Sequence, residues 1–582
     1  MQLSTDTVPP ARLTGFFARL ARQPLIVLAI VFACLPLALA TTLTMPIGPM
    51  YWDHYIYLDA ANRIADGQIP SIHFFAPVGA LGYYLFAAWL YLFPDGHPLL
   101  LASWSLMTVT VPLMALVLLD VQKRSVATAY ALLLPFLFFS LLPFNTGEFY
   151  PYPGSHGFAI YNRQVSQLLY VLAAALVFVR GWKMLAAITT LAMLALTFVK
   201  VTGLVAGGLL CLTAFLAGRL RFHAAFLAGL LFLAACGVIE LWSGLVSAYA
   251  GDILSLLEIN DSSLLPRLLQ AASLNFGMVL ACFLLALVLL AQGYPVLRGA
   301  LRAFAAQPGR RAFTDILDQP FFWLAGFLAA GLIFESQNTG SQAFIFLWPL
   351  LLAILAASYR QANSTRFAVV AVLVLAAALP LAVTVAQKSS RAWIGTLNNI
   401  PLAHQHLKSM GAVSAREAFL TRAQRLRENY IDYRDAYEAI ADAGELPSFL
   451  LTSDYDFQAL WLQSADQAVS AVLAYEAAND IRFETIMSID FTSPFAWLMD
   501  RHAPEHIAIG ADPTRSVPAA DQSVIDAVSA VDIALYPTCP PTLGRLKLLE
   551  LYEPILEAGH TRITLTPCYD AFLRKALLAK EA

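Results

Sequence analysis

The sequence predicts a polytopic α-helical membrane protein that ends in a soluble α/β domain. Three observations lead to this fold class: the overall composition, a series of long apolar stretches, and a change of character near residue 390. Of the 582 residues, 59% are hydrophobic and 13% are charged, and the mean hydropathy is +0.65. These values lie outside the range of soluble globular chains. The net charge of −3 and the lack of a long basic run argue against a nucleic-acid partner.

Apolar stretches long enough to cross a membrane define the predicted architecture. A helix needs about 17 to 25 apolar residues to span the hydrocarbon core. Eleven such stretches lie near residues 25–44, 98–119, 126–143, 164–180, 184–199, 201–218, 223–241, 271–291, 320–335, 341–358 and 366–386. The first follows Arg12, Arg19 and Arg22 and could pass for a signal peptide. Its length of ~20 residues and the spans after it favour an uncleaved first helix.

The distribution of Lys and Arg between the loops predicts the topology. Fifteen basic residues belong to loops on one side: Arg12, Arg19, Arg22, Lys123, Arg124, Arg180, Lys183, Arg219, Arg221, Arg298, Arg302, Arg310, Arg311, Arg360 and Arg366. The opposite loops carry four: Arg63, Arg163, Lys200 and Arg267. This bias predicts an inner N-terminus and an outer C-terminus. The bias in Lys and Arg holds only if residues 78–93 do not cross the membrane. We therefore expect an interfacial or half-inserted helix there, within an outer loop of residues 45–97.

A soluble outer domain is predicted for residues 390–582, after a membrane domain of residues 1–389. Its length of about 190 residues is ordinary for one domain. It opens with a charged helical stretch at 414–444, after which helix-like and strand-like runs alternate. The strand-like runs are FLLTS from residue 449, TIMSIDF from 485, HIAIG from 506, VDIALYP from 531 and RITLTP from 562. This alternation is typical of an α/β or α+β fold.

Cysteine placement agrees with this topology. Four cysteines fall inside predicted spans, where a thiol serves as a small apolar residue: Cys34, Cys211, Cys236 and Cys282. The outer domain contains only Cys539 and Cys568. In an oxidising compartment these two can form a disulfide that ties the last strands together. The alternative is a pair of unrelated buried thiols.

The first outer loop carries the most informative motif, YWDHYIYLDAANRIADGQIP, from residue 51. Apolar residues recur at helical spacing from Tyr55 to Asp66, as in an amphipathic helix lying along the membrane surface. The polar residues line another face, which we expect to be solvated. Gly67 suits its C-terminal end. Asp53, just before the helix, has two possible roles. It can cap the helix N-terminus, or it can act as a base that removes a proton from an acceptor hydroxyl.

A longer run carries a family resemblance: WDHYIYLDAANRIADGQIPSIHFFAPVGALGYYLFAAWLYLF, from residue 52. It resembles the first outer loop of the GT-C glycosyltransferase superfamily, which includes protein O-mannosyltransferases and lipid A aminoarabinose transferases. Members share an acidic residue soon after the first span, an interfacial helix closing on glycine, a proline-containing segment and a further apolar helix. Asp53, Gly67, Pro77 and the aromatic run from Tyr83 match that order. The resemblance implies an inverting sugar transfer from a polyprenyl phosphate, with Asp53 as base and Asp59 as the competing acid.

The motif also departs from the family pattern. His54 follows Asp53 where many members carry a second acid, and a single proline replaces a frequent Pro-Pro pair. The subfamily therefore stays open. Oligosaccharyltransferase relatives hold a divalent cation with several acidic residues, and the outer loops contain no such cluster. We therefore predict no metal and no other cofactor.

A lipid-phosphate donor requires cations at the interface to stabilise the leaving group. Lys200, in LTFVKVTGLVAGG, turns between two short helices, and K-x-T-G at such a hairpin resembles a segment of several superfamily members; the alternative is a snorkelling lysine. Arg163, in GFAIYNRQVSQ, could bind phosphate bidentately or be a solvated helix-start residue. Arg63 could also bind phosphate, although pairing with Asp59 or Asp66 along its own helix is the simpler expectation.

Four further polar residues are candidates for lining the substrate site: His54, His73, Glu335 and Asn338. His73 could orient substrate or titrate near neutrality, but a single loop histidine often has a structural role. Glu335 and Asn338 belong to IFESQNTGSQAF, at the outer end of a span. They could face the sugar, or they could simply form the turn.

Three classes of function follow. The leading hypothesis is an enzyme, a hexosyl- or pentosyltransferase of the bacterial cytoplasmic membrane, which moves a sugar from a polyprenyl-phosphate carrier to an envelope lipid, glycan or protein. A transporter or lipid flippase would show an internal repeat and charges within the spans, and neither is clear. A non-catalytic GT-C-like partner protein is the third. The aromatics Trp461, Phe491, Phe495 and Trp497 could stack on sugars, though a buried core explains them more simply.

Overall fold

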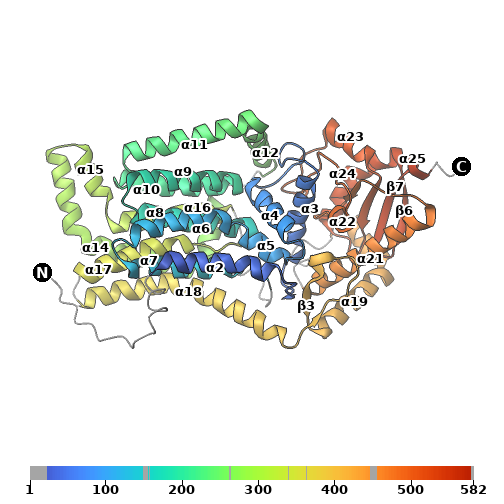
Figure 1. Cartoon of the computed structure of the whole chain (residues 1–582), viewed down its shortest axis with the longest axis horizontal. Coiled ribbons are helices and arrows are strands. Elements are labelled where there is room, and N and C mark those ends of the chain that lie inside the picture. Colours follow the sequence, from blue (N-terminus) through green and yellow to red (C-terminus); the bar gives the residue numbers. More distant parts are fainter. Residues whose placement is uncertain are drawn as a thin grey trace.

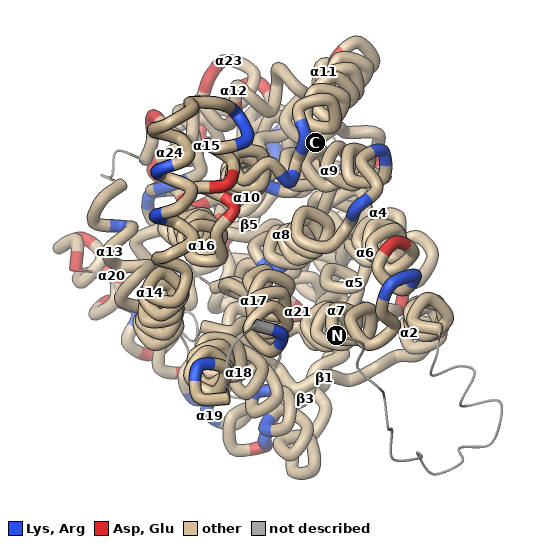
Figure 2. The backbone as a smooth tube through the Cα atoms, turned by 90° about the vertical axis from the view of Figure 1, so that its left-hand side faces the viewer, with Lys and Arg blue, Asp and Glu red and all other residues tan. Residues whose placement is uncertain are grey.

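The computed structural model describes residues 23–147, 155, 157–260, 264–337, 340–361, 364–445 and 455–578. Long helices run side by side to form a bundle, and the C-terminal domain sits at one end of it (Figure 1). We call this the domain end. The loops at the opposite end carry most of the Lys and Arg residues that predicted the topology, and Figure 2 looks onto that basic end.

Each of the eleven predicted apolar stretches coincides with helix. The bundle helices are α2 (Pro24–Leu39), α5 (Pro98–Trp104), α6 (Met107–Val121), α7 (Val126–Leu141), α8 (Ile160–Phe178), α9 (Trp182–Val199), α10 (Val201–Leu216), α11 (Phe222–Ser243), α14 (Phe276–Ala306), α16 (Pro320–Ser336), α17 (Trp348–Gln361) and α18 (Ser364–Thr396). Shorter helices are α12 (Leu245–Ile259), α13 (Leu264–Leu274) and α15 (Arg310–Leu317).

Five helical segments of the described chain are long and apolar enough to cross a membrane: Pro98–Val121, Trp182–Val199, Phe222–Ser243, Phe276–Ala306 and Ser364–Thr396. The bent pair Arg310–Leu317 and Pro320–Ser336 would make a sixth, and several shorter apolar helices lie beside them. The chain is therefore a multi-pass membrane protein. The number of eleven crossings stays a prediction.

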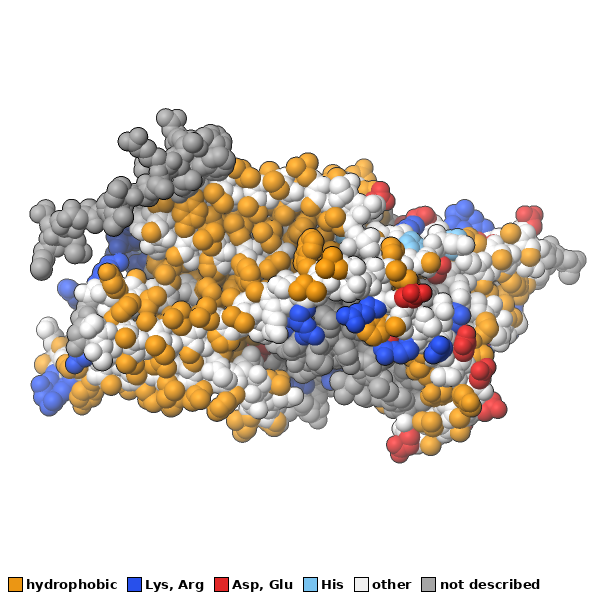
Figure 3. All heavy atoms as spheres, turned by 90° about the horizontal axis from the view of Figure 1, so that it is seen from below, with side chains coloured by type: hydrophobic (Ala, Val, Ile, Leu, Met, Phe, Trp, Pro, Cys, Tyr) orange, Lys and Arg blue, Asp and Glu red, His pale blue; other side chains and the backbone are white. Residues whose placement is uncertain are grey.

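The bundle has a buried centre and a lipid-facing rim. Helix α8 lies at the centre, since all but three of its nineteen residues are buried. Helix α11 lies at the rim, with only Ala224 and Ala228 buried. An apolar helix that stays exposed is expected to face lipid. Figure 3 shows hydrophobic side chains covering the bundle surface, whereas charged side chains are mixed among them on the C-terminal domain.

Helices α3 (His54–Ala65) and α4 (Leu81–Leu92) lie between the bundle and the C-terminal domain (Figure 1). Helix α4 has twelve residues, about 18 Å, which is too short to cross the hydrocarbon core. It packs on α3 through Tyr57, whose ring centroid lies 5.2 Å from that of Tyr83. The prediction of a solvated polar face on α3 is wrong for Asp59 and Arg63, which are 2% and 1% exposed. This part of the face packs against the C-terminal domain.

The C-terminal domain contains a four-stranded sheet in the order β4-β5-β7-β6. The strands are β4 (Ile486–Ser488), β5 (Ile533–Pro537), β6 (His560–Thr566) and β7 (Tyr569–Arg574). Strand β4 runs parallel to β5, and the other two pairings are antiparallel. Buried side chains alternate between two core clusters, one with helix α21 and the other with helix α24, so helices cover both faces. The helices of this domain are α19 (Glu417–Asp432), α20 (Arg434–Asp442), α21 (Tyr455–Asn479), α22 (Phe495–Met499), α23 (Gln522–Ala530), α24 (Leu543–Gly559) and α25 (Lys575–Leu578).

The runs from residues 485, 531 and 562 form strands, as expected, whereas FLLTS lies outside the described residues. The prediction of a strand at HIAIG is wrong. His506 N–H donates to the carbonyl of His73 at 2.6 Å, and Ile509 N–H donates to that of Phe75 at 3.1 Å, so this segment pairs with the first outer loop rather than with the sheet. Strand β7 was not predicted.

A second, three-stranded sheet joins the bundle to the domain in the order β1-β3-β2. Its strands are β1 (Met45–Pro46), β2 (Ile400–Pro401) and β3 (Val413–Ala415). Helix α18 runs on to Thr396, past the predicted boundary at residue 389. The predicted disulfide between Cys539 and Cys568 is formed, with a Cα separation of 5.0 Å, and it links the segment after β5 to the start of β7.

Candidate functional site

A group of buried polar side chains lies at the domain end of the bundle, where the first turn of α8 meets the first outer loop and the α9–α10 turn. Asp53, Asn162, Arg163 and Glu335 are buried members of the group, and Tyr161 and Lys200 are its half-buried members. Charged groups near a bilayer are costly to bury and usually have a functional role. The structure therefore brings together four of the charged residues singled out in the sequence: Asp53, Arg163, Lys200 and Glu335.

Asp53 ends the short 3-10 helix η1 (Tyr51–Asp53) and precedes α3. Its side chain makes no capping hydrogen bond, so the role of helix cap is wrong. The residue is 9% exposed, and its Oδ1 atom has no hydrogen-bond partner among the described residues. Burial raises the pKa of Asp53 to about 8, although the backbone N–H of Ala159 and the charge of Arg163 act to lower it. A buried carboxylate with an unsatisfied oxygen is suited to accept a proton or a substrate hydrogen bond.

Arg163 enters the site from the first turn of α8. The residue before this helix, Ala159, has a φ of 55° in the left-handed region, which turns the chain sharply into the bundle. Arg163 is buried, and its Nη1 donates to Oδ1 of Asn145 at 3.0 Å and to the carbonyl of Phe158 at 3.3 Å. Its charge acts on Asp53 and on the Tyr57 hydroxyl. The guanidinium is thus fixed by the loop before α8, beside the carboxylate.

Lys200 is the single residue between α9 and α10, as expected for a hairpin position. Its Nζ donates to Oδ1 of Asn162 at 3.2 Å and lies 4.4 Å from the ring centroid of Tyr161. Burial lowers the pKa of Lys200, and the charge of Glu335 partly opposes this. Since Tyr161 and Asn162 immediately precede Arg163, the two cations approach the same turn of α8. The positive end of the α8 dipole adds to their field.

Glu335 lies in the last turn of α16, where it accepts a hydrogen bond from the hydroxyl of Ser341. Nearby, Nη1 of Arg267 on α13 donates to Oε1 of Gln337 at 3.1 Å. Asn338 lies outside the described residues. The charge of Glu335 acts on Lys200, which links this acid to the site. That the turn faces a sugar stays a prediction.

Two candidate site residues, Arg63 and Asp59, lie at the interface with the C-terminal domain. Nε of Arg63 donates to Oδ1 of Asp59 at 2.9 Å, and its Nη1 donates to the carbonyl of Pro504 at 2.5 Å. Nη1 also donates to Oε1 of Gln68 at 3.3 Å. The expectation of pairing with Asp59 is confirmed. The expectation that Arg63 binds donor phosphate and that Asp59 competes as base is corrected, because each satisfies the other at the interface with the C-terminal domain.

The two candidate histidines, His54 and His73, form hydrogen bonds with the nearby backbone. Nδ1 of His54 donates to the carbonyl of Tyr51 at 2.6 Å, and its ring centroid lies 4.8 Å from that of Tyr51. Burial lowers the pKa of His54, so the ring is neutral. Nδ1 of His73 accepts a hydrogen bond from the N–H of Ile69 at 2.8 Å and closes a turn. Neither contact favours the substrate-lining role predicted for these residues.

Sequence reasoning missed Asn145 and Lys388. Asn145 orients Arg163, and Nζ of Lys388 donates to the carbonyls of Asn145 and Gly147 at 3.0 and 3.1 Å. Lys388 is 5% exposed and belongs to the C-terminal part of α18. A usable signal was present, since Lys388 is the first charged residue after the last predicted span. No signal marked Asn145.

Across the described ranges, no three His, Cys, Asp or Glu side chains are grouped closely enough to hold an ion. A metal-free reaction stays a prediction.

Comparisons with known proteins concern the fold. No protein-family model matches the chain, and no curated protein matches it. The chain is similar to the solved structure of ArnT from Cupriavidus metallidurans in the apo state, with 11% identity, a TM-score of 0.38, and coverage of 94% of this chain and 97% of that one. ArnT bound to undecaprenyl phosphate gives 10% identity and a TM-score of 0.34, with the same coverage.

A third similar structure is the archaeal oligosaccharyltransferase AglB from Archaeoglobus fulgidus, in complex with an inhibitory peptide and a dolichol-phosphate. The identity is 11% and the TM-score 0.25, over 94% of this chain and 73% of that chain. Both proteins belong to the GT-C superfamily. At these TM-scores the likeness carries no argument about the site.

Proposed function

We propose that the protein is an inverting glycosyltransferase that moves a sugar from a polyprenyl-phosphate carrier to a lipid, glycan or protein of the cell envelope. The observation that carries this proposal is the position of Asp53. A buried carboxylate with one unsatisfied oxygen lies beside Arg163, and Lys200 approaches the same turn of α8. Base and anion-binding groups are thus held within one site.

In the proposed reaction, Asp53 removes the proton from an acceptor hydroxyl. The acceptor oxygen then attacks the anomeric carbon from the face opposite the phosphate, so the new C–O bond forms as the bond to the phosphate oxygen breaks. The proton stays on Asp53, and the electron pair leaves with the lipid phosphate. A single displacement of this kind inverts the anomeric centre. The raised pKa of Asp53 makes it a stronger base than an exposed carboxylate.

The cations act on the leaving group. As the sugar–phosphate bond breaks, negative charge grows on the phosphate oxygens, and fixed positive groups lower the energy of that state. Arg163 is held by Asn145, and Lys200 is held by Asn162, so both are placed before substrate arrives. The N-terminus of α8 points its dipole at the same region. We assign the donor phosphate to these groups.

We assign the prenyl chain to an apolar groove that begins at Leu204, about one helical turn from Lys200, and extends toward Leu220 at the basic end. It has a volume of about 320 Å³ and lies between α9, α10 and α11. Its lining includes Met193, Leu204, Phe215 and Phe232. Because α9 and α10 join at Lys200, a prenyl chain in this groove runs along the same hairpin whose turn carries the phosphate-binding lysine. In this proposal the site faces the outer leaflet of the bacterial cytoplasmic membrane.

Transfer from radiolabelled polyprenyl-phosphate sugars by the purified, lipid-reconstituted protein tests the proposal. We expect transfer by the wild type and a loss of about 100-fold or more in Asp53→Asn, the size typical of a lost general base. Asp95→Asn is the matched control, because Asp95 is an exposed acid of the same outer loop. Unchanged transfer by Asp53→Asn would remove Asp53 as the base. No transfer from any such donor by the wild type would overturn the proposed function.

A further inference from the structure

The turn that carries Asp53 is held by the C-terminal domain rather than by the bundle alone. Trp52 N–H, immediately before Asp53, donates to Oε1 of Gln458 on α21 at 3.0 Å. The Tyr51 hydroxyl donates to the carbonyl of Met410 at 3.2 Å. Trp52 lies in the first turn of a helix, where backbone N–H groups have no partner within the helix. Gln458 supplies that partner, and it comes from more than 400 residues along the chain.

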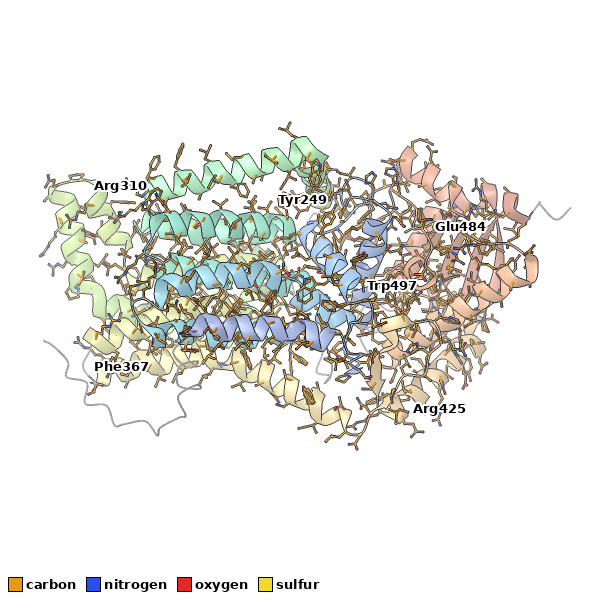
Figure 4. The ribbon with its side chains drawn as sticks, viewed as in Figure 1. Tyr249, Arg310, Phe367, Arg425, Glu484 and Trp497 are labelled. Atoms are coloured by element: carbon orange, nitrogen blue, oxygen red, sulfur yellow. A yellow bond between two sulfur atoms is a disulfide. The ribbon has the colours of Figure 1, made fainter. Side chains whose placement is uncertain are left out.

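Aromatic packing reinforces this contact on both sides of Asp53. The Trp52 ring lies 5.3 Å from Phe457 and 5.2 Å from Phe491, centroid to centroid. The Tyr55 ring lies 4.9 Å from Trp461. Trp461, Phe495 and Trp497 are buried, so the domain aromatics form a core with the first outer loop. Figure 4 shows Trp497 at this junction. Aromatic pairs of this kind add to the burial energy and fix ring positions.

Helix α3 is attached to the same domain along its length. Asn62 Nδ2 donates to the carbonyl of Arg501 at 2.9 Å, and Gln68 Nε2 donates to that of Ala503 at 2.8 Å. By contrast, the carboxylate of Asp53 makes no bond within its own turn. The carboxylate accepts a hydrogen bond from the Ala159 N–H at the start of α8. The backbone that carries it is also held by contacts across the domain interface.

From this geometry we infer that the C-terminal domain is part of the active site, with Gln458 as a positioning residue that holds the Asp53 turn in place for proton removal. The inference rests on the proposed function. It gives the domain a role in the chemical step, in addition to any contact with the acceptor. A change far from the reacting atoms that displaces a catalytic group by about 1 Å can lower the rate about 100-fold. One hydrogen bond at this turn can therefore control turnover.

Gln458→Met tests the inference, because it keeps the side-chain length and removes the acceptor. Leaving a buried N–H without a partner costs enough to displace the turn, and we expect kcat to fall about tenfold to 100-fold with little change in donor KM. Gln467→Met is the matched control, since Gln467 is an exposed residue of the same helix. If Gln458→Met does not fold, Gln458→Asn withdraws the acceptor while it keeps the amide.

The pH profile distinguishes positioning from a general loss of stability. The groups that face Asp53 are Arg163 and Tyr161 on α8 and Tyr57 on α3. These groups are unchanged in the variant, so a shift in the acidic limb of the pH profile reports a change in the surroundings of Asp53 itself. A displaced carboxylate gains access to water and loses part of its raised pKa, so the acidic limb of kcat should move to lower pH. A variant with wild-type kcat and an unmoved acidic limb overturns the inference.

Amide hydrogen exchange separates this inference from the proposed function, since it needs no substrate. We expect the amide of Trp52 to exchange faster in Gln458→Met than in the wild type or in Gln467→Met. Unchanged exchange at Trp52 overturns the inference even where transfer is observed. Faster exchange in a protein that transfers no sugar supports the role of Gln458 in holding the Asp53 turn and overturns only the glycosyltransferase function.

Discussion

Two acids of the first outer loop, Asp53 and Asp59, lie six residues apart and interact differently with their arginines. Asp59 and Arg63 form a direct, buried ion pair, and the guanidinium also bonds to the backbone of the C-terminal domain. Asp53 is also buried, but one of its oxygens has no partner in the described chain, and Arg163 acts on it through charge. Buried polar groups are nearly always satisfied in folded proteins. The satisfied pair is therefore structural, and the unsatisfied acid is the one that we propose as the base.

The largest expected effect comes from replacing each acid by its amide. Asp53→Asn should lower transfer about 100-fold to 10,000-fold, because it removes the base. Asp59→Asn should leave the activity of the folded protein close to that of the wild type and should lower stability, by about 3 to 5 kcal/mol if Arg63 is left unpaired. Transfer assays and thermal unfolding of both variants measure the two effects. Loss of transfer by Asp59→Asn at unchanged thermal stability would contradict a purely structural role for Asp59.

The two arginines should separate in the same way. Arg163→Met removes a fixed cation beside the leaving phosphate, and we expect transfer to fall about 100-fold, the cost of losing one such group in other enzymes. Arg63→Met leaves Asp59 buried without its partner, so its main effect should fall on the free energy of unfolding. Steady-state kinetics with varied donor measure the first effect. A normal rate in Arg163→Met would show that the phosphate is bound elsewhere.

The pH dependence of stability sharpens the contrast. The pKa of Asp53 is raised from its ordinary value to about 8, so between about pH 4 and pH 8 the folded protein holds a proton that the unfolded chain has released. Its contribution to stability is therefore present at low pH and is lost as the pH rises through this window. Asp53→Asn should unfold at a higher temperature than the wild type at pH 8, and the difference should shrink toward pH 4. A difference that grows toward low pH would contradict the raised pKa.

The sequence allowed the bundle to be predicted closely because the length of an apolar run is a local property. Each of the eleven runs became helix, and Lys200 occupies the turn expected for it. Asp53 could be singled out for the same reason, since its place after the first span and before α3 depends only on neighbouring residues. The distinction between a capping and a free carboxylate needed the surrounding structure.

What could not be predicted depends on contacts between distant segments. The polar face of α3 was expected to meet water, but it meets the backbone of Ala503 and Pro504. HIAIG has the alternation of a strand, yet its backbone bonds to the loop at His73 and Phe75. Asn145, which orients Arg163, lies in a loop without any pattern. Hydropathy and spacing describe one segment at a time, so they do not show which surface a segment will cover.

The smallest expected effect belongs to the third acid of this region, Asp66, which follows α3. It pairs with Nδ1 of His502 at 3.0 Å, but the histidine side chain is 62% exposed. Exposed ion pairs contribute about 0 to 1 kcal/mol, so Asp66→Asn should change the free energy of unfolding by no more than that and should leave transfer unchanged. The three acids then form a series in which burial and satisfaction, rather than charge, decide the role. If Asp66→Asn loses transfer while it keeps its stability, the polar face of α3 takes part in the reaction. The ion pair between Asp59 and Arg63 would then no longer identify that face as structural.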